Sequence, residues 1–427
     1  MEGIIRRGNP PASPSALRQV RQPGGDLRLT ASPPSTSPAP HAPSAQPLHI
    51  LVLMSRTGGG HLASARALEA EFQAQRPGCR VTIVDLLTDH IAFPFSRMPR
   101  GYDTLVGRAP RLWHTMWRMT AIAPVARSSA AIVRRMSRTH IEALLREARP
   151  DLVVSVHPLV NHLVIPVLER VAPRTRYVTV VTDLGGIHPS WLHPRNAAIY
   201  LPTERAVELA AARGLPRQRL HAHGLPVRAD FARTAAERSD TCRAFGLDPD
   251  LPAVLVMGGG GGIGPMESIV SETAAALSAA SPARPAAQIV VVCASNARLK
   301  ERLAAATWPV PVTALGYVDR MSDLMQACDL LVTKAGPGTI AEASIRGLPM
   351  LLYGFIPGQE GANVDHVVDA GAGLFEPRVE ALARTAAGLL TLDVDRRTAM
   401  AEKARSLGRA RATHDIVTSI LTEVLAR

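Results

Sequence analysis

The segment Ser55-Arg56-Thr57-Gly58-Gly59-Gly60-His61 combines a glycine turn with a histidine, between an apolar run and a helix-forming stretch. A strand that ends in glycines and enters a helix presents backbone N–H groups to an anion. A histidine there is suited to general-base chemistry, because its reference pKa of about 6.5 lies near neutral pH. The segment therefore predicts either a base that faces a hydroxyl or a phosphate-binding turn.

Two other interpretations of this segment stay open. Gly58, Gly60 and Ala63 satisfy a G-x-G-x-x-A pattern, and Asp85 ends the next expected strand, which is the pattern of a dinucleotide site. That pattern would indicate an NAD-dependent oxidoreductase, although His61 would crowd the pyrophosphate. Alternatively, His61 only caps the helix.

Two more glycine-rich turns follow apolar runs. Residues 257–265 contain five consecutive glycines, which permit close backbone approach, so we expect a phosphate site there rather than a merely flexible loop. In residues 333–343, Thr339 and Glu342 have the spacing of a capping box, which gives Glu342 a structural role. The functional alternative is that Glu342 accepts hydrogen bonds from a ribose. Residues 357–363 add amide and carboxylate groups that suit sugar hydroxyls.

Residues 93–120 concentrate aromatic and methionine side chains in a chain with only 4% aromatic residues. Arginines are interleaved with them, a pattern that predicts a segment lying in a membrane interface. The alternatives are a buried amphipathic helix and a surface that stacks single-stranded nucleic acid. The aromatic members, expected to contact acceptor and membrane, are Phe93, Phe95, Tyr102, Trp113 and Trp117.

The composition fits a two-domain protein of 427 residues with 46% hydrophobic content. The net charge of +12 favours an anionic substrate or surface. Most of the basic excess is arginine, so the charge alone is a weak guide to the partner. The four cysteines form no CxxC pair, so we expect no metal site, no disulfide framework and a reducing compartment. No apolar run reaches about 18 residues, and we expect neither a membrane span nor a secretory signal.

Apolar runs alternate with helical patterns after a Pro-rich tail over residues 1–47, which we expect to be disordered. Continuous Val/Ile/Leu runs between helices predict parallel sheets covered on both faces. The fold class is α/β, with two Rossmann-like doubly wound domains that face a cleft. Expected strands cover 50–54, 81–86, 151–156, 177–182, 198–201, 253–257, 289–293, 312–315, 330–333 and 350–352. Expected domains are 48–223 and 224–400, followed by a helix over 401–427.

Taken together, these segments resemble the monogalactosyldiacylglycerol synthase family of glycosyltransferases over roughly residues 48–400. The resemblance implies a GT-B fold, with the lipid acceptor in the first domain and the UDP-sugar in the second. The matching motifs are LMSRTGGGH, PFSRMPRGYDTLVG, HPLVNH, VTDLGGIHPSWLH, GLPVRADF, MGGGGGIGP and KAGPGTIAEASIRGLPMLLYGFIPGQEGANV.

The resemblance also implies roles for single residues. His61 matches the catalytic base, Arg228 an arginine on the donor phosphates, and Glu342 the ribose acceptor. The UDP-sugar site implied in this way, with the glycine turns included, comprises Gly60, Arg228, Gly258, Gly259, Gly260, Tyr317, Val318, Gly336, Pro337, Gly338, Thr339, Ile340, Glu342, Gln359, Glu360 and Asn363.

The expected reaction is an inverting transfer of a sugar from a UDP-sugar to the sn-3 hydroxyl of 1,2-diacylglycerol. Galactose is the expected sugar, and glucose or another lipid acceptor is the alternative. We expect no cofactor, no metal and no nucleic acid. The expected partners are the UDP-sugar, diacylglycerol and an anionic lipid surface. The expected location is cytoplasmic, on the inner face of the cell membrane. A catalytically silent lipid-binding protein remains the alternative from another class.

Overall fold

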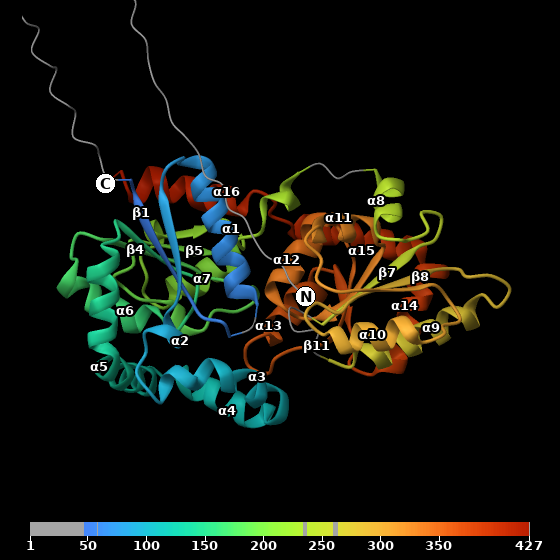
Figure 1. The fold of residues 1–427 in the computed structure, drawn as a ribbon, viewed down its shortest axis with the longest axis horizontal. Helices are drawn as coiled ribbons and strands as arrows, with labels where there is room; N and C mark the ends of the chain where they lie inside the picture. The colour runs from blue at the N-terminus through green and yellow to red at the C-terminus, as the bar shows by residue number, and fades with distance from the viewer. Residues whose placement is uncertain (1–46, 58, 234–236, 259–263, 427) are drawn as a thin grey trace, which may run out of the picture. The chain divides into compact units, whose positions relative to one another are not determined.

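A computed structural model describes residues 47–57, 59–233, 237–258 and 264–426. The expected Pro-rich tail up to residue 46, together with Gly58, Gly259 and Gly260, lies outside the described residues. The described chain contains two six-stranded sheets with helices packed against them (Figure 1). The α/β prediction with two Rossmann-like sheets is confirmed.

All strands in both sheets run parallel, in the orders β2-β1-β3-β4-β5-β6 and β12-β11-β10-β7-β8-β9. Each order reverses direction from a central strand, as in doubly wound folds. The strands are β1 His49–Met54, β2 Arg80–Asp85, β3 Leu152–Ser155, β4 Arg176–Val180, β5 Ala198–Leu201, β6 Leu220–Ala222, β7 Ala253–Met257, β8 Gln288–Val292, β9 Val312–Leu315, β10 Leu330–Lys334, β11 Met350–Gly354 and β12 Gly373–Phe375.

Helices connect the strands, and most of them bury apolar residues against the sheets. They are α1 Gly60–Gln75, α2 Leu86–Asp89, α3 Met98–Arg108, α4 Pro110–Thr120, α5 Ala123–Ala148, α6 Asn161–Val171, α7 Glu204–Ala212, α8 Arg238–Ala244, α9 Met266–Ala280, α10 Ala297–Ala305, α11 Met321–Ala327, α12 Pro337–Arg346, α13 Gly361–Asp369, α14 Val379–Thr391, α15 Val394–Leu407 and α16 Ala412–Ser419.

The central strands are buried along their whole length, which explains why the sequence predicts them well. Every residue of β1 and of β7 is buried, as expected for strands covered on both faces. The edge strands β6 and β12 have three residues each and were not predicted. A three-residue run is too short to show a period.

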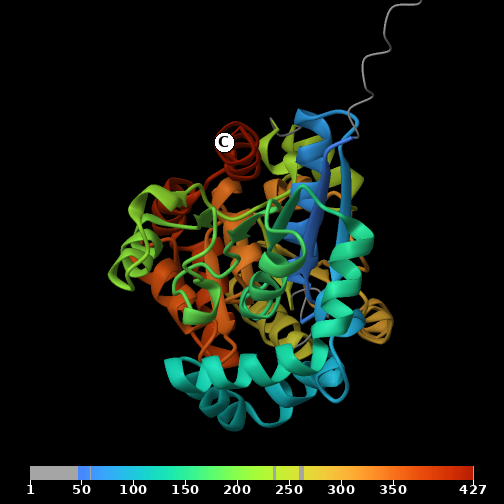
Figure 2. The ribbon, with the colours of Figure 1, turned by 90° about the vertical axis from the view of Figure 1, so that its left-hand side faces the viewer.

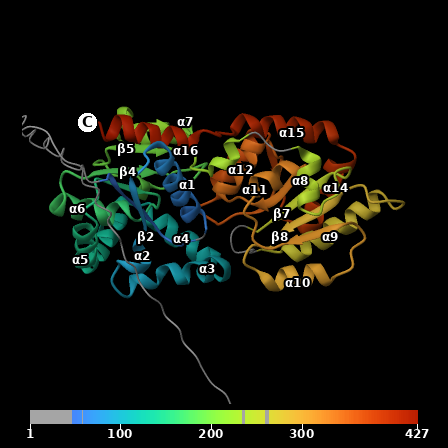
Figure 3. The same cartoon turned by 45° about the horizontal axis from the view of Figure 1, so that its top comes forward.

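The C-terminal helix α16 packs on the first sheet rather than on the second. Ile416, Val417 and Ile420 are fully buried in the same cluster as Phe72 of α1. α1 and α16 lie side by side (Figures 1 and 3). The chain thus crosses back to the first sheet after α15. The expected domain limits at residues 223 and 400 remain predictions.

Helices α3, α4 and α5 follow one another along the chain and form a block coloured blue-green in Figure 2, in which α5 packs against β1 and β3. α5 packs on α6, and α4 contacts both α3 and α5. Among the described residues, no helix combines the length and the apolar content that crossing a bilayer requires.

Candidate active site

His61 lies in the first turn of α1, immediately beyond the carboxyl end of β1. Its Nδ1 lies 2.8 Å from the carbonyl oxygen of Val156 and 3.0 Å from Oγ1 of Thr182. A carbonyl can only accept, so Nδ1 carries the proton and Nε2 keeps its lone pair. Val156 and Thr182 follow the neighbouring strands β3 and β4. The sheet therefore presents the imidazole in the tautomer that a base needs.

Burial changes the acid–base properties of His61 from those expected of a free histidine. The side chain is 8% exposed, and burial lowers the pKa of His61 to about 4. The imidazole is therefore neutral at physiological pH and ready to accept a proton. An anion close to the ring would be needed to stabilise the imidazolium that forms.

A second buried histidine holds the loop in front of His61. The rings of His157 and His61 lie 4.6 Å apart in an edge-to-face arrangement. Nδ1 of His157 accepts from the backbone of Leu159, so its Nε2 donates to Oγ1 of Thr57 at 3.0 Å. This contact ties the glycine turn to the end of β3. The histidine pattern in HPLVNH was the available signal, although its spacing did not show this role.

Asp183 supplies a buried carboxyl at the carboxyl end of β4. Nε1 of Trp191 donates to it at 2.5 Å, and the indole of Trp191 lies 6.3 Å from the ring of His61. Burial raises the pKa of Asp183 to about 7, a shift that the nearby charge of Glu360 reinforces. Trp191 thus lies between this carboxyl and the candidate base.

The dinucleotide interpretation of the first glycine turn fails at Asp85. Its carboxylate accepts from the backbone N–H and the hydroxyl of Thr88, and from the backbone N–H of Arg56. Asp85 caps α2 and braces the loop after β1. These contacts use the oxygens that a ribose would require.

Arg228, which follows β6, and Glu342 of α12 lie close enough to interact electrostatically. Nη1 of Arg228 donates to the carbonyl of Asp319 at 2.7 Å, and its Nη2 lies 3.2 Å from the Asp230 carboxylate. Burial raises the pKa of Glu342 to about 7, against the effect of Arg228 and with that of Asp230. This group can offer a cation to phosphate and a carboxylate to hydroxyls.

The capping-box role proposed for Glu342 is wrong. α12 begins at Pro337 with Gly336 as its N-cap, so Thr339 lies inside the first turn and does not cap it. The first backbone N–H groups of α12, those of Gly338 and Thr339, have no partner within the helix by geometry. N–H groups at a helix start can bind an anion. A Cβ on Gly338 would meet no atom within 4 Å, so the turn is open in front of it.

The loop after β11 is held by ion pairs and amide contacts. Nζ of Lys334 lies 2.6 Å from the Glu360 carboxylate, whose other oxygen accepts from the Ile356 backbone at 2.9 Å. Asn363 donates to the carbonyl of Ala335 and accepts from the backbone N–H of Gly185, at 2.9 and 2.8 Å. Glu360 and Asn363 are buried, so they mainly position this loop.

The same loop meets the α3–α4 block. Oη of Tyr102 donates to Oε1 of Gln359 at 2.9 Å. Gly358 has φ +83°, and a Cβ there would lie 2.8 Å from the Trp117 ring. Only glycine fits that approach. The expected sugar-contacting loop and the expected acceptor segment are therefore in contact.

The remaining residues of the expected nucleotide site are distributed over both sheets and α12. Gly258 is buried directly after β7. Tyr317 is 75% exposed after β9, and Val318 packs against the core. Ile340 is fully buried and anchors α12. Gly60 is exposed at the start of α1 in the first sheet.

The aromatic residues of the expected acceptor segment divide between the surface and the interior. Phe93 is 66% exposed, whereas Tyr102, Trp113 and Trp117 pack edge to face and tilted with ring centroids 5.1 and 5.7 Å apart. Phe95 packs against the core. The exposed apolar side chains of this block are mainly aliphatic: Met98, Leu112, Met116, Met119, Ile122, Ile132 and Met136.

No group of three or more His, Cys, Asp or Glu side chains suited to a metal ion occurs within the described part of the chain. Cys79, Cys242, Cys293 and Cys328 are free thiols.

Comparison with known proteins decides the family. The model of monogalactosyldiacylglycerol synthase matches residues 61–227, and that of the glycosyltransferase family 28 C-terminal domain matches residues 253–416. The chain belongs to the monogalactosyldiacylglycerol synthase family. It is 38% identical over 375 residues to a probable monogalactosyldiacylglycerol synthase 3 of Oryza sativa subsp. japonica, covering 87% of this chain and 74% of the relative. It is 37% identical to monogalactosyldiacylglycerol synthase 1 of Arabidopsis thaliana, covering 87% and 70%.

Solved structures with little sequence identity share the fold. MurG of Acinetobacter baumannii aligns with a TM-score of 0.56 at 16% identity, covering 88% of this chain and 99% of that one. A UDP-GlcNAc 2-epimerase from Neisseria meningitidis bound to UDP-GlcNAc aligns with a TM-score of 0.54 at 14% identity, covering 88% and 100%. Transferase and epimerase share this GT-B architecture, so the reaction must be argued from the site.

The predicted location is wrong. The relatives at 36–38% identity are named as chloroplastic proteins, which contradicts a cytoplasmic protein on the inner face of the cell membrane. The composition carried no information on the compartment beyond the absence of paired cysteines.

Proposed function

We propose that this protein is an inverting glycosyltransferase that moves galactose from UDP-galactose to the sn-3 hydroxyl of 1,2-diacylglycerol. The observation that carries the proposal is the buried His61, whose Nδ1 is held by Val156 so that Nε2 is free to take a proton. The chain belongs to the monogalactosyldiacylglycerol synthase family, and this membership supports a UDP-sugar and diacylglycerol as its substrates.

In this mechanism Nε2 of His61 removes the proton from the lipid hydroxyl. The oxygen attacks the anomeric carbon on the face opposite UDP, so the anomeric configuration inverts. Negative charge grows on the departing diphosphate, where Arg228 and the start of α12 stabilise it. The same charge favours the imidazolium, whose formation burial otherwise opposes.

The second sheet would hold the nucleotide. In this proposal Glu342 would accept hydrogen bonds from the ribose, and Arg228 and the first turn of α12 would hold the diphosphate. Gln359 and Glu360 lie in the loop expected beside the sugar. Arginine and backbone N–H groups can carry the diphosphate charge without a divalent metal.

The α3–α4 block would meet the lipid surface. Its exposed methionine, leucine and isoleucine side chains suit the acyl boundary, and the arginines of the segment suit anionic headgroups. Because Tyr102 and Trp117 of this block contact the loop at Gln359 and Gly358, a bound lipid would lie close to the donor sugar.

Turnover tests the proposal. The full chain is incubated with diacylglycerol in vesicles and either UDP-galactose or UDP-glucose, and the products are resolved by mass spectrometry and linkage analysis. A β-linked monogalactosyl product with UDP-galactose is expected. A glucosyl product only, or UDP release without glycolipid, contradicts it. Tight binding of NAD without binding of UDP would contradict the proposal and support the oxidoreductase hypothesis.

A further inference from the structure

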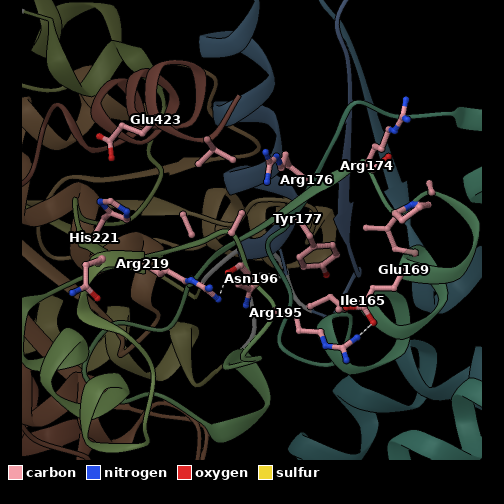
Figure 4. A pocket seen from close by; sticks show the side chains of 18 residues that line it. Ile165, Glu169, Arg174, Arg176, Tyr177, Arg195, Asn196, Arg219, His221 and Glu423 are labelled. Carbon is pink, nitrogen blue, oxygen red and sulfur yellow. Dashed lines mark hydrogen bonds and ion pairs between the residues drawn. The ribbon is translucent and has the colours of Figure 1, made fainter. Parts of the chain in front are cut away.

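A hollow of about 610 Å³ opens at the amino ends of strands β4, β5 and β6 (Figure 4). Arg176 begins β4, and the residues just before β5 and β6 line the rest, together with part of α6. The candidate active site lies at the opposite, carboxyl end of these strands. Arg176 and Thr182 are six residues apart, roughly 20 Å along an extended strand. The hollow is therefore separate from the proposed reaction.

Its rim is strongly basic. The lining includes Arg174, Arg176, Arg195 and Arg219, against the carboxylates of Glu169 and Glu423. Arg195 is paired with Glu169. Nη1 of Arg219 donates to the carbonyls of Pro194 and Asn196, at 2.8 and 3.4 Å, which orients the guanidinium without neutralising it.

Three of these arginines keep uncompensated charge. Across residues 47–57, 59–233, 237–258 and 264–426, no ion pair involves Arg174, Arg176 or Arg219. Like charges gathered around one hollow repel one another, which a bound anion would relieve.

The wall of the hollow also includes a buried amide. Asn196 is 1% exposed, and its side-chain amide lies 3.0 Å from Oγ1 of Thr179, which fixes this wall against β4.

We propose that this hollow binds a phosphate ester. Planar guanidinium groups match phosphate oxygens, and the volume is within the usual range for a small ligand. Glu423 also lines the hollow and is then available to a hydroxyl of the esterified alcohol. Such an ester could be a soluble metabolite or the headgroup of an anionic lipid, and the two sources share this chemistry.

Calorimetric titration of the full chain with sn-glycerol 3-phosphate tests the proposal, with UDP present in saturating amount to fill the nucleotide site. Saturable binding is expected, weakened at least about tenfold in the double variant Arg176→Ala/Arg219→Ala. The control is Arg217→Ala, which removes a neighbouring exposed arginine that does not line the hollow. Circular dichroism confirms that each variant is folded.

A second arm uses sedimentation with vesicles containing phosphatidylglycerol or only phosphatidylcholine. Binding of sn-glycerol 3-phosphate that depends on Arg176 and Arg219 supports a soluble ester. Dependence on these arginines only with phosphatidylglycerol vesicles supports a lipid headgroup. If the double variant matches the Arg217→Ala variant in both arms, the proposal is overturned. Because transfer activity is not the readout, this outcome leaves the proposed function untouched.

Discussion

The 2.8 Å hydrogen bond from Nδ1 of His61 to the carbonyl oxygen of Val156 fixes which nitrogen of the imidazole carries the proton. His61, the candidate base, follows β1. Val156, whose carbonyl orients it, follows β3, which is the neighbour of β1 in the sheet. A base oriented through its far nitrogen is held ready without a carboxylate partner.

The protonation state of His61 can be measured directly. Because burial lowers its pKa to about 4, the ring should stay neutral as pH falls from 7 to 5, whereas an exposed histidine protonates near 6.5. Nuclear magnetic resonance of ¹⁵N-labelled histidine should show the Nδ1–H tautomer across this range. Comparison with a His61→Asn sample assigns the signal. Protonation near pH 6.5 would contradict the buried geometry.

Thr182→Val should impair catalysis without impairing substrate binding. The change removes the Oγ1 that lies 3.0 Å from Nδ1 of His61 and keeps the side-chain volume. We expect kcat to fall roughly tenfold with little change in KM, because orientation of the base is lost. Thr182→Ser keeps the hydroxyl and should restore most of kcat. Equal losses in both variants would show that packing, not the hydroxyl, matters at this position.

Glu342→Gln should weaken nucleotide binding, by about tenfold in Kd for UDP, because a ribose loses a charged acceptor. The pKa of Glu342 is raised to about 7, so the carboxylate forms as pH rises through 7. UDP affinity of the wild-type protein should therefore increase over that interval, and that of the variant should not. Calorimetry at several pH values measures both effects.

The matched control for this prediction is Glu380→Gln. Glu380 is an exposed glutamate in the first turn of α14. UDP binding in that variant should have the affinity and pH dependence of the wild-type protein. If Glu342→Gln behaves in the same way as Glu380→Gln, Glu342 does not contact the nucleotide.

The exposed aliphatic side chains of α4 should carry membrane attachment. Changing Leu112, Met116 and Met119 together to Ser removes apolar groups that are 44–54% exposed, so folding should be little affected. We expect at least a tenfold loss of binding to anionic vesicles in flotation experiments. Leu392→Ser removes an 81% exposed leucine elsewhere and should bind like the wild-type protein. Equal binding by all three proteins would place the lipid surface elsewhere.

The sequence predicts the sheets better than the surroundings of the site. Strands such as β1 and β7 are long buried apolar runs, so composition alone marks them. The glycine-rich turns could also be predicted from the sequence, because few residue types other than glycine permit such tight turns between a strand and a helix. The start of α12 was misplaced, since Thr339 and Glu342 match a capping box while Pro337 and Gly336 supply the real start.

What the sequence could not show is which distant residues share an environment. The contact between His157 and Thr57 joins residues a hundred positions apart, and the low pKa of His61 depends on burial by several elements. The aromatic residues of the α3–α4 block illustrate the same limit. A pattern of Trp and Arg is equally compatible with a lipid surface and with packing, and Trp113 and Trp117 in fact pack against each other.

His61→Ala tests the central claim most directly, since nothing else in the site is proposed to take the proton of the lipid hydroxyl. The measurement is the rate of glycolipid formation in vesicles, taken with UDP affinity from calorimetry and folding from circular dichroism. The proposal predicts a folded protein that binds UDP like the wild-type protein while transfer falls by about 10²–10⁴-fold. Transfer at the wild-type rate would contradict a catalytic role for His61.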